Sequence, residues 1–351
     1  MAQKASRSGL LQRLAEGPVI CAEGYVFELE RRGYLQAGAF VPEVVLEHPE
    51  AVLELHREFV RAGSDVVEAF TYYGHREKLR LIGREGDLEP LNRRALELAA
   101  QAAAESGALV AGNICNTNIF GPGDAASAAQ VRAMFEEQVG WAAEAGVDFI
   151  VAETLSFLGE AEIALDVIRA VGLPSVVTFA IHKTGLTRDG MTPADAARRI
   201  EDQGADVVGM NCIRGPKTFM PHLKAIRQAV SIHVAGLPVP YRTTEAEPTF
   251  ESLTDPVCAH CLPDGRSFPV ALDPFQCTRY EIAEFATEAN AIGVGYLGVC
   301  CGAGPHHIRS MAEALGRKPP ASRYSPDMSK HYALGNDARL REDQRAYATD
   351  L

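Results

Sequence analysis

The sequence predicts an α/β protein in which eight parallel strands alternate with helices and close into a (β/α)8 TIM barrel. Eight short runs rich in β-branched and apolar residues alternate with alanine- and leucine-rich stretches of helical period. A chain of 351 residues is long enough for one such barrel. A doubly wound open sheet is the alternative, but no Gly-x-Gly-x-x-Gly follows the first run, which disfavours a dinucleotide-binding fold.

The expected strands are short and regularly spaced along the chain. They cover residues 18–23, 65–71, 108–113, 148–153, 175–181, 206–212, 232–237 and 294–300. The stretches with helical spacing of apolar residues include 90–104, 128–145, 159–171, 193–203 and 220–230. Gly63, Gly146 and Gly204 each stand just before an expected strand, a position that suits the C-terminal cap of the preceding helix.

Two segments depart from this alternation. Residues 238–278 form a long insertion in the seventh unit that is rich in Pro, Asp and Thr, and loops of that length in compact domains are more often functional than accidental. Residues 319–351 are polar and charged, so they form either a frayed tail or an arm that grips another subunit. We therefore expect a barrel domain over residues 1–317 and a C-terminal oligomerisation arm over residues 318–351.

Composition narrows the partners and the location. With 47% hydrophobic and 23% charged residues, the chain can bury an ordinary globular core. A formal net charge of −12 argues against a nucleic-acid partner, which requires a basic face. No apolar run reaches about 18 residues and the N-terminus lacks a signal-peptide pattern, so we expect no membrane and a cytoplasmic location. In that compartment the eight cysteines should all be reduced.

Active sites of such barrels gather at the carboxyl ends of the strands. The residues expected at those strand ends include three thiols, two carboxylates and several aromatic residues, which would lie together at one end of the barrel. The residues are Glu23, Thr71, Tyr72, Tyr73, Asn113, Glu153, Cys212, Cys300 and Cys301. A polar residue at one strand end is commonly only a helix cap, but their collection over many strands predicts an active site.

Cys212, Cys300 and Cys301 are candidate metal ligands. Adjacent residues of a strand point to opposite faces, so the thiols of Cys300 and Cys301 can converge only where the strand ends, and Gly302 permits a turn there. Three thiolates suit a zinc ion that keeps its fourth position open for a substrate. The alternatives are buried cysteines that act as small hydrophobes and a vicinal disulfide.

Two further groups carry weaker signals. Cys258 and Cys261, with Cys277 as a possible third member, could hold a structural metal, but one C-x-x-C is a weak signal and we expect free thiols. His306 and His307 could ligate a metal or act as bases, but they also read as the ordinary first turn of a helix.

Glu153 and the aromatic residues point to a pocket for a cation. Glu153 follows four apolar residues, and an unpaired carboxylate is costly to bury, so we expect it to face a cationic ligand group. Phe40, Phe70, Tyr72 and Tyr73 are either core residues or walls of a donor pocket, where a cation over an aromatic face is stabilised by roughly 0.5–2 kcal/mol.

Several segments together resemble the zinc-dependent homocysteine S-methyltransferases, and within them the betaine–homocysteine S-methyltransferase branch. The matching segments are residues 24–34, 47–51, 55–59, 62–65, Gly-Met-Asn-Cys at 209–212 and Cys-Cys-Gly at 300–302. The resemblance implies a (β/α)8 barrel with one zinc ion per subunit on Cys212, Cys300 and Cys301. It also implies homocysteine as methyl acceptor, methionine as product and a small onium compound such as betaine as methyl donor.

The resemblance carries over unevenly to single residues. Glu153 matches the carboxylate that holds the amino group of homocysteine, and Tyr73 matches a tyrosine that can approach the zinc before substrate arrives. The family's Asp-Gly-Gly after the first strand is Ala22-Glu23-Gly24 here, so the aspartate is missing and Glu23 stands one residue later.

The donor side departs further from the family pattern. A tryptophan of the betaine pocket is replaced by Phe40, and the tyrosine after the family glutamate by Thr154. The substrate-binding set that we expect is Glu23, Gly24, Phe40, Tyr72, Tyr73, Asn113, Glu153 and Thr154.

Alternatives therefore stay open for the methyl donor, for the acceptor thiol and for the role of the protein as an enzyme. The donor could be a sulfonium compound, dimethylsulfoniopropionate or S-methylmethionine, and the acceptor a different thiol. A non-catalytic zinc or thiol sensor is the alternative outside enzymes. Residues 319–322 and 338–347 resemble the family's oligomerisation arm, which predicts a homodimer or homotetramer.

Overall fold

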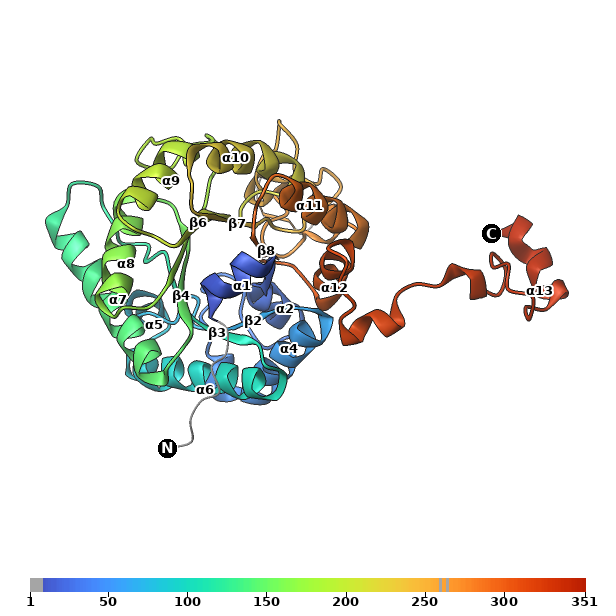
Figure 1. Cartoon of the computed structure of the whole chain (residues 1–351), viewed down its shortest axis with the longest axis horizontal. Helices are drawn as coiled ribbons and strands as arrows, with labels where there is room; N and C mark the ends of the chain where they lie inside the picture. The colour runs from blue at the N-terminus through green and yellow to red at the C-terminus, as the bar shows by residue number, and fades with distance from the viewer. Residues whose placement is uncertain (1–8, 259–260, 263–264) are drawn as a thin grey trace.

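A computed structural model describes residues 9–258, 261–262 and 265–351. Eight parallel strands follow one another around a closed barrel, and β1 pairs with β8 to close it (Figure 1). The strands are β1 (Val19–Ala22), β2 (Val66–Glu68), β3 (Leu109–Cys115), β4 (Phe149–Leu155), β5 (Ser175–Phe179), β6 (Val207–Asn211), β7 (His233–Leu237) and β8 (Tyr296–Val299). The predicted barrel and all eight predicted strands are confirmed.

Most of the helices surround the barrel, and the last one lies on the C-terminal segment outside it (Figure 1). They are α1 (Leu10–Glu16), α2 (Tyr25–Arg31), α3 (Val44–Glu47), α4 (Pro49–Ala62), α5 (Arg76–Leu81), α6 (Leu88–Ser106), α7 (Ala125–Ala145), α8 (Leu158–Ala170), α9 (Pro193–Asp202), α10 (Pro216–Ala229), α11 (Arg279–Ala291), α12 (Pro305–Ala314) and α13 (Glu342–Arg345). Gly63 and Gly146 are left-handed C-caps of α4 and α7, as predicted.

The hydrophobic core has two layers because alternate strand residues face the barrel axis and the helices. Val66, Phe149 and Tyr296 belong to the inner layer, which Leu10 and Leu14 of α1 extend at the amino end of the barrel. The outer layer packs the strands against the helices. Since α1 fills the amino end, the functional residues lie at the opposite end.

The described part of the long segment between β7 and α11 contains short 3-10 helices at Phe250–Ser252 and Asp273–Phe275 and two isolated antiparallel β-bridges. Cys258 and Cys261 form a disulfide there, with their Cα atoms 5.6 Å apart. The expectation that all eight cysteines are reduced, and these two free, is therefore wrong. The Cys258 amide donates to the Asp255 carbonyl, 3.2 Å away, in the turn that precedes the disulfide.

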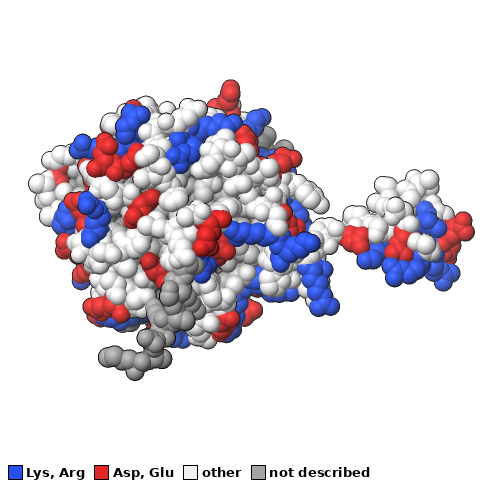
Figure 2. Space-filling view, in the orientation of Figure 1, with Lys and Arg blue, Asp and Glu red and all other residues white. Residues whose placement is uncertain are grey.

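The C-terminal segment leaves the barrel after α12 and extends away from it (Figure 1). Tyr324, Tyr332, Leu334 and Tyr347 are exposed along it. Figure 2 shows acidic and basic side chains mixed over both the barrel and this segment. The division into a barrel domain and an arm, and the role of the arm in assembly, stay predictions.

No helix in the described ranges combines the length and the apolar character needed to cross a membrane.

Candidate functional site

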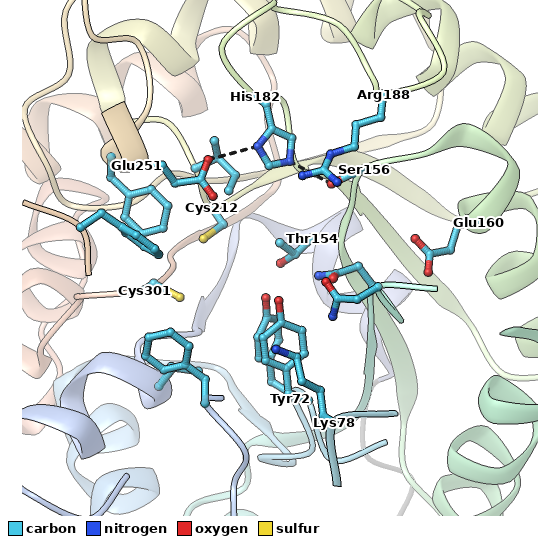
Figure 3. Close-up of a pocket in the computed structure, with 18 of the residues that line it drawn as sticks. Tyr72, Lys78, Thr154, Ser156, Glu160, His182, Arg188, Cys212, Glu251 and Cys301 are labelled. Carbon is cyan, nitrogen blue, oxygen red and sulfur yellow. Dashed lines mark hydrogen bonds and ion pairs between the residues drawn. The ribbon is translucent and has the colours of Figure 1, made fainter. Parts of the chain in front are cut away.

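The carboxyl ends of the strands open onto a cavity of about 400 Å³. Figure 3 shows side chains from many strands and loops around it, with Cys212 and Cys301 on one side. A second cavity of about 10 Å³ lies next to it, since Cys301 and Tyr72 line both. Glu23, Glu68, Asn113, Glu153 and Cys300 line the smaller cavity.

Backbone strain is concentrated at the larger cavity. Six non-glycine residues in the described part of the chain have a left-handed backbone, with φ from 55° to 64°, and all six line this cavity. They are Phe40, Tyr73, Asn118, Thr154, Cys212 and Ile213. Such conformations cost on the order of 1–3 kcal/mol each, and they cluster at functional sites. The strain therefore marks this cavity as the working site.

Cys212, Cys300 and Cys301 converge as predicted, and their sulfurs all lie within 4.8 Å of one another. The Cys300 and Cys301 sulfurs are 3.9 Å apart, so there is no vicinal disulfide. β8 ends at Val299, and Gly302 turns the chain with φ 93°. A Cβ at Gly302 would lie 2.2 Å from the Tyr241 hydroxyl, so the turn requires glycine.

Hydrogen bonds fix the loops that carry the three thiols. The Cys212 amide donates to the Leu237 carbonyl over 2.8 Å, and the Cys300 amide to the Pro238 carbonyl over 2.9 Å. Hydrogen bonds from the other two thiols hold the pKa of Cys212 well below its usual range, while burial raises that of Cys300. The chemistry of three convergent sulfurs suits a soft metal ion: zinc–sulfur bonds of about 2.3 Å at tetrahedral angles separate sulfurs by about 3.8 Å.

A buried cluster of carboxylates and amides lies beside the thiols. The Asn113 amide donates to Glu153 over 2.8 Å and also to Glu68. The Asn211 amide donates to Glu153 over 2.6 Å and to Glu23 over 3.3 Å. Within the described residues, no Lys, Arg or His forms an ion pair with these three carboxylates, so the cluster is suited to bind a cation.

Burial changes the acidity of the cluster. Burial raises the pKa values of Glu23 and Glu153 well above their usual range; Glu153 and Glu68 add to the effect on Glu23, and Glu68 adds to the effect on Glu153. Burial raises the pKa of Glu68 to about 7. A ligand ammonium group placed among these carboxylates would stabilise their charged forms.

Aromatic residues form another part of the cavity wall. Phe40, Tyr72 and Tyr73 line the large cavity, and the two tyrosine rings have centroids 4.3 Å apart. Lys78 Nζ lies 3.8 Å from the centroid of the Tyr73 ring. Burial raises the pKa of Tyr73 to about 12, so its phenol carries a proton at neutral pH.

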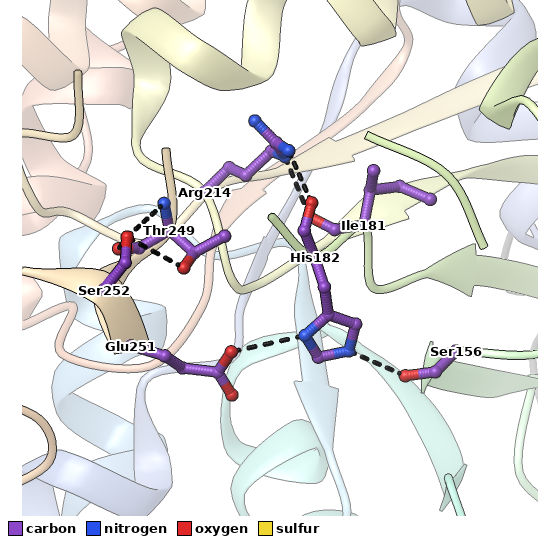
Figure 4. A network of polar contacts seen from close by, with 7 residues as sticks. All are labelled: Ser156, Ile181, His182, Arg214, Thr249, Glu251 and Ser252. Atoms are coloured by element: carbon purple, nitrogen blue, oxygen red, sulfur yellow. Dashed lines mark hydrogen bonds and ion pairs between the residues drawn. The ribbon is translucent and has the colours of Figure 1, made fainter. Parts of the chain in front are cut away.

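A polar network that the sequence did not predict forms another part of the wall (Figure 4). Nε2 of the His182 ring lies 2.9 Å from the Ser156 hydroxyl, and Nδ1 lies 3.2 Å from Oε2 of Glu251. The buried Arg214 donates to the carbonyls of Ile181 and His182 and so holds the loop after β5. This network fixes the orientation of the His182 ring at the cavity.

The structure places four residues that the sequence singled out. Gly24 lines neither cavity, and a Cβ there would lie 2.1 Å from the Ala303 carbonyl oxygen, so close packing requires glycine; its contact with substrate stays a prediction. His307 is buried and its Nε2 lies 3.2 Å from the Cys277 carbonyl oxygen, which confirms the helix-start interpretation. Asn113 and Glu153 lie inside β3 and β4, two residues before the strands end.

The chain is similar to known homocysteine methyltransferases. A family model described as homocysteine S-methyltransferase matches residues 20–315. The chain is 37% identical to betaine–homocysteine S-methyltransferase 1 of Danio rerio over 337 residues, which cover 95% of this chain and 81% of the relative. It is 34% identical to S-methylmethionine–homocysteine S-methyltransferase BHMT2 of Mus musculus over 346 residues, which cover 95% and 88%.

A solved structure has a similar fold. The metallated form of the homocysteine methyltransferase MmuM from Escherichia coli superposes with a TM-score of 0.66 at 18% identity. The superposition covers 86% of this chain and 99% of that chain.

Proposed function

Because the chain belongs to the homocysteine S-methyltransferase family and methylates homocysteine to methionine, we propose that Cys212, Cys300 and Cys301 hold one zinc ion for this reaction. The observation that carries the proposal is the convergence of three buried sulfurs that form no disulfide, beside the strained cavity. Bound there, zinc would lower the pKa of the homocysteine thiol so that thiolate is present near neutral pH.

The carboxylate cluster is proposed to hold the amino group of homocysteine. Glu153 is oriented by Asn113 and Asn211, and Glu23 lies within reach of the same Asn211 amide. An ammonium group between Glu153 and Glu23 would give these buried carboxylates the positive partner that they lack. Glu23 would then supply the charge of the missing family aspartate from the neighbouring position.

The remaining volume is proposed to hold an onium methyl donor. Phe40, Tyr72 and Tyr73 can contact its cationic head, and the cavity can hold the two substrates at attack distance. The thiolate attacks the donor methyl group in line, and the donor leaves as a neutral amine or sulfide. No general acid is needed, because the leaving group departs with the electron pair that neutralises it.

Betaine is the first candidate donor, and a sulfonium compound is the second. The similarity to a relative named for S-methylmethionine supports the second candidate. Phe40 and Thr154 make the cation pocket less enclosed than the tryptophan and tyrosine of the family pattern, which also favours it. If the acceptor were a thiol other than homocysteine, the carboxylate cluster would have to bind a different ligand.

A donor panel tests the proposed function. Zinc-reconstituted protein is incubated with homocysteine and betaine, dimethylsulfoniopropionate or S-methylmethionine, and methionine is quantified by mass spectrometry. We expect methionine from at least one donor, and loss of both zinc and turnover in Cys212→Ala. Cys277→Ala, at a buried free thiol outside the trio, is the matched control and should keep both.

Two results would contradict the proposal. An active, zinc-replete Cys212→Ala would reject the ligand set. Zinc binding without methionine from any donor would reject these donor and acceptor assignments and favour a zinc or thiol sensor.

We also propose that residues 318–351 join two or four copies of the chain. The exposed Tyr324, Tyr332, Leu334 and Tyr347 support this, since apolar side chains on an extended segment favour burial against a partner. Light scattering on the full chain should give a dimer or tetramer mass, and a monomer would reject the proposal.

A further inference from the structure

Three side chains at the wall of the large cavity form a hydrogen-bonded series that the proposed methyl transfer does not use. Ser156 follows β4, His182 lies in the loop after β5, and Glu251 belongs to the 3-10 helix Phe250–Ser252. All three line the large cavity (Figure 3, Figure 4). The series therefore joins three segments of the chain at a surface that a small ligand can reach.

The series has the order and the distances of a serine–histidine–carboxylate triad. The Ser156 hydroxyl lies 2.9 Å from Nε2 of His182, and Oε2 of Glu251 lies 3.2 Å from Nδ1. Because an ionised carboxylate only accepts hydrogen bonds, Nδ1 carries the proton in this arrangement, and Nε2 is left to accept the proton of the hydroxyl. A histidine held in this tautomer is the base that turns a serine hydroxyl into a nucleophile.

Contacts behind the three side chains hold them in place. Arg214 is buried, and its guanidinium donates to the backbone carbonyl of His182. On the other side, Thr249 and Ser252 cap one another around Glu251. The backbone is thus fixed on both sides of the contact between His182 and Glu251 (Figure 4). A catalytic base needs such support to keep its orientation during a reaction.

A purely structural latch between the two loops is the alternative interpretation. Such a latch needs only the contact between His182 and Glu251. The second ring nitrogen, however, meets Ser156, whose hydroxyl has no other hydrogen-bond partner in the part of the chain that the structure describes. A latch does not account for this third member, and a triad requires it.

The surroundings of Ser156 suit the oxyanion that forms when a hydroxyl attacks a carbonyl group. Ser156 stands between the end of β4 at Leu155 and the start of α8 at Leu158. The first amides of a helix lack partners within the helix, and the helix dipole is positive there. Arg188 lines the same cavity, and its backbone amide donates to the Ser156 carbonyl over 2.7 Å. Helix-end amides and a guanidinium are thus present at this wall to stabilise a developing negative charge.

We propose that Ser156, His182 and Glu251 form a second catalytic centre, which hydrolyses esters of small carboxylic acids. Nε2 of His182 takes the proton of Ser156 Oγ while this oxygen bonds to the ester carbonyl carbon. The alcohol oxygen leaves with the electron pair of the broken bond and receives that proton. Water then attacks the acyl-serine with the help of the same base, which releases the acid and restores the serine. The cavity of about 400 Å³ limits the ester to a small molecule.

Serine labelling and ester hydrolysis test this centre. The zinc-loaded full chain is treated with a fluorophosphonate, which forms a phosphonyl-serine and releases fluoride, and the labelled peptide is identified by mass spectrometry. Steady-state hydrolysis of 4-nitrophenyl acetate is followed through release of 4-nitrophenolate. We expect the label on Ser156 in the wild type and none in His182→Ala. Hydrolysis should be at least about 100-fold slower in Ser156→Ala than in the wild type.

Ser175→Ala is the matched control. Ser175 is buried at the start of β5, and its hydroxyl also forms a hydrogen bond, to Asp206 over 3.3 Å. The variant should keep both the label and the rate of hydrolysis. Glu251→Gln keeps a hydrogen-bonding side chain but loses the charge, so it should slow hydrolysis by at least about tenfold.

Three results would overturn the second catalytic centre: no label on Ser156 in the wild type, a label that persists in His182→Ala, or a wild-type rate of hydrolysis in Ser156→Ala. The label on the wild type requires no variant, so the test stands even if His182→Ala does not fold. A labelled Ser156 in protein that forms no methionine from any donor would leave this centre standing and reject the proposed function instead.

Discussion

The side-chain amide of Asn211 donates to Oε2 of Glu153 over 2.6 Å and joins β6 to β4 at the mouth of the barrel. Its carbonyl oxygen accepts from the backbone amide of Thr154 over 2.8 Å. Thr154 has a left-handed backbone, with φ 58°. One side chain thus orients the buried carboxylate and holds the strained residue that follows it.

Replacing Asn211 by alanine should weaken both stability and homocysteine binding. The change removes one hydrogen-bond donor from Glu153, which keeps Asn113 and the Thr154 hydroxyl, and leaves the Thr154 amide without its partner; an unpaired buried group costs roughly 1–3 kcal/mol. We expect the free energy of unfolding to fall by about 3 kcal/mol and the KM for homocysteine to rise at least about tenfold. Urea unfolding and steady-state kinetics measure the two effects.

Asn92→Ala is the matched control for this prediction. Asn92 is also buried and donates to the carbonyls of Gly74 and Leu88, away from the carboxylate cluster. It should lower stability and leave the KM for homocysteine unchanged. An Asn211→Ala protein with wild-type KM would show that Glu153 does not depend on this amide.

Replacing Glu153 by glutamine should raise the KM for homocysteine by about 10- to 100-fold. A hydrogen bond to a charged group contributes roughly 1.5–3 kcal/mol, and glutamine keeps the shape of the side chain but not the charge. Glu160→Gln is the control, because Glu160 is buried at the same cavity but accepts hydrogen bonds from Thr117. Equal KM changes in both variants would contradict the role of Glu153.

Glu68 should make the metal-free protein less stable as the pH rises. Burial raises its pKa from 4.5 to about 7 in the folded state, so the folded protein holds this proton more tightly than the unfolded chain. The resulting stabilisation is fully present below about pH 4.5 and is lost as the pH rises through about 7. Urea unfolding at a series of pH values measures the slope.

Glu68→Gln tests the origin of this slope, because the amide does not titrate. Its stability should fall less between about pH 5 and about pH 8 than that of the wild type, with both proteins kept in EDTA. Glu23 and Glu153 also have raised pKa values and remain in both proteins. Equal slopes would assign the pH dependence to those two residues.

The fold and the thiol cluster could be predicted because their signals are local. Each strand is a short β-branched run, and glycine caps such as Gly63 and Gly146 mark where helices end. The cysteines follow β6 and β8 directly, and the carboxyl ends of parallel strands meet at one end of a barrel. Their convergence therefore followed from strand positions alone.

Glu68 was missed because one strand is shorter than predicted. The run over residues 65–71 suggested an end at Thr71, but β2 ends at Glu68, so the last strand residue is a carboxylate. The left-handed backbones of Thr154 and Cys212 also escaped prediction. Nothing in the sequence distinguishes such residues from extended ones, because the surrounding structure imposes the strain.

The contact of His182 with Glu251 depends on chain segments that local patterns do not connect. The two residues are 69 positions apart. Glu251 lies in a 3-10 helix of the long segment after β7, where Thr249 and Ser252 cap one another. The sequence shows that this segment is long, but only the three-dimensional structure shows which strand end it contacts.

The disulfide between Cys258 and Cys261 predicts a specific count of thiols. Denatured protein that has not been exposed to reductant should react with Ellman's reagent at six cysteines, and at all eight after reduction. Cys258→Ser should show one more free thiol than the unreduced wild type. Its stability should fall by less than about 2 kcal/mol, because the bond closes a loop of only a few residues. Eight reactive thiols without reduction would show that the pair is reduced in solution, as the sequence alone suggested.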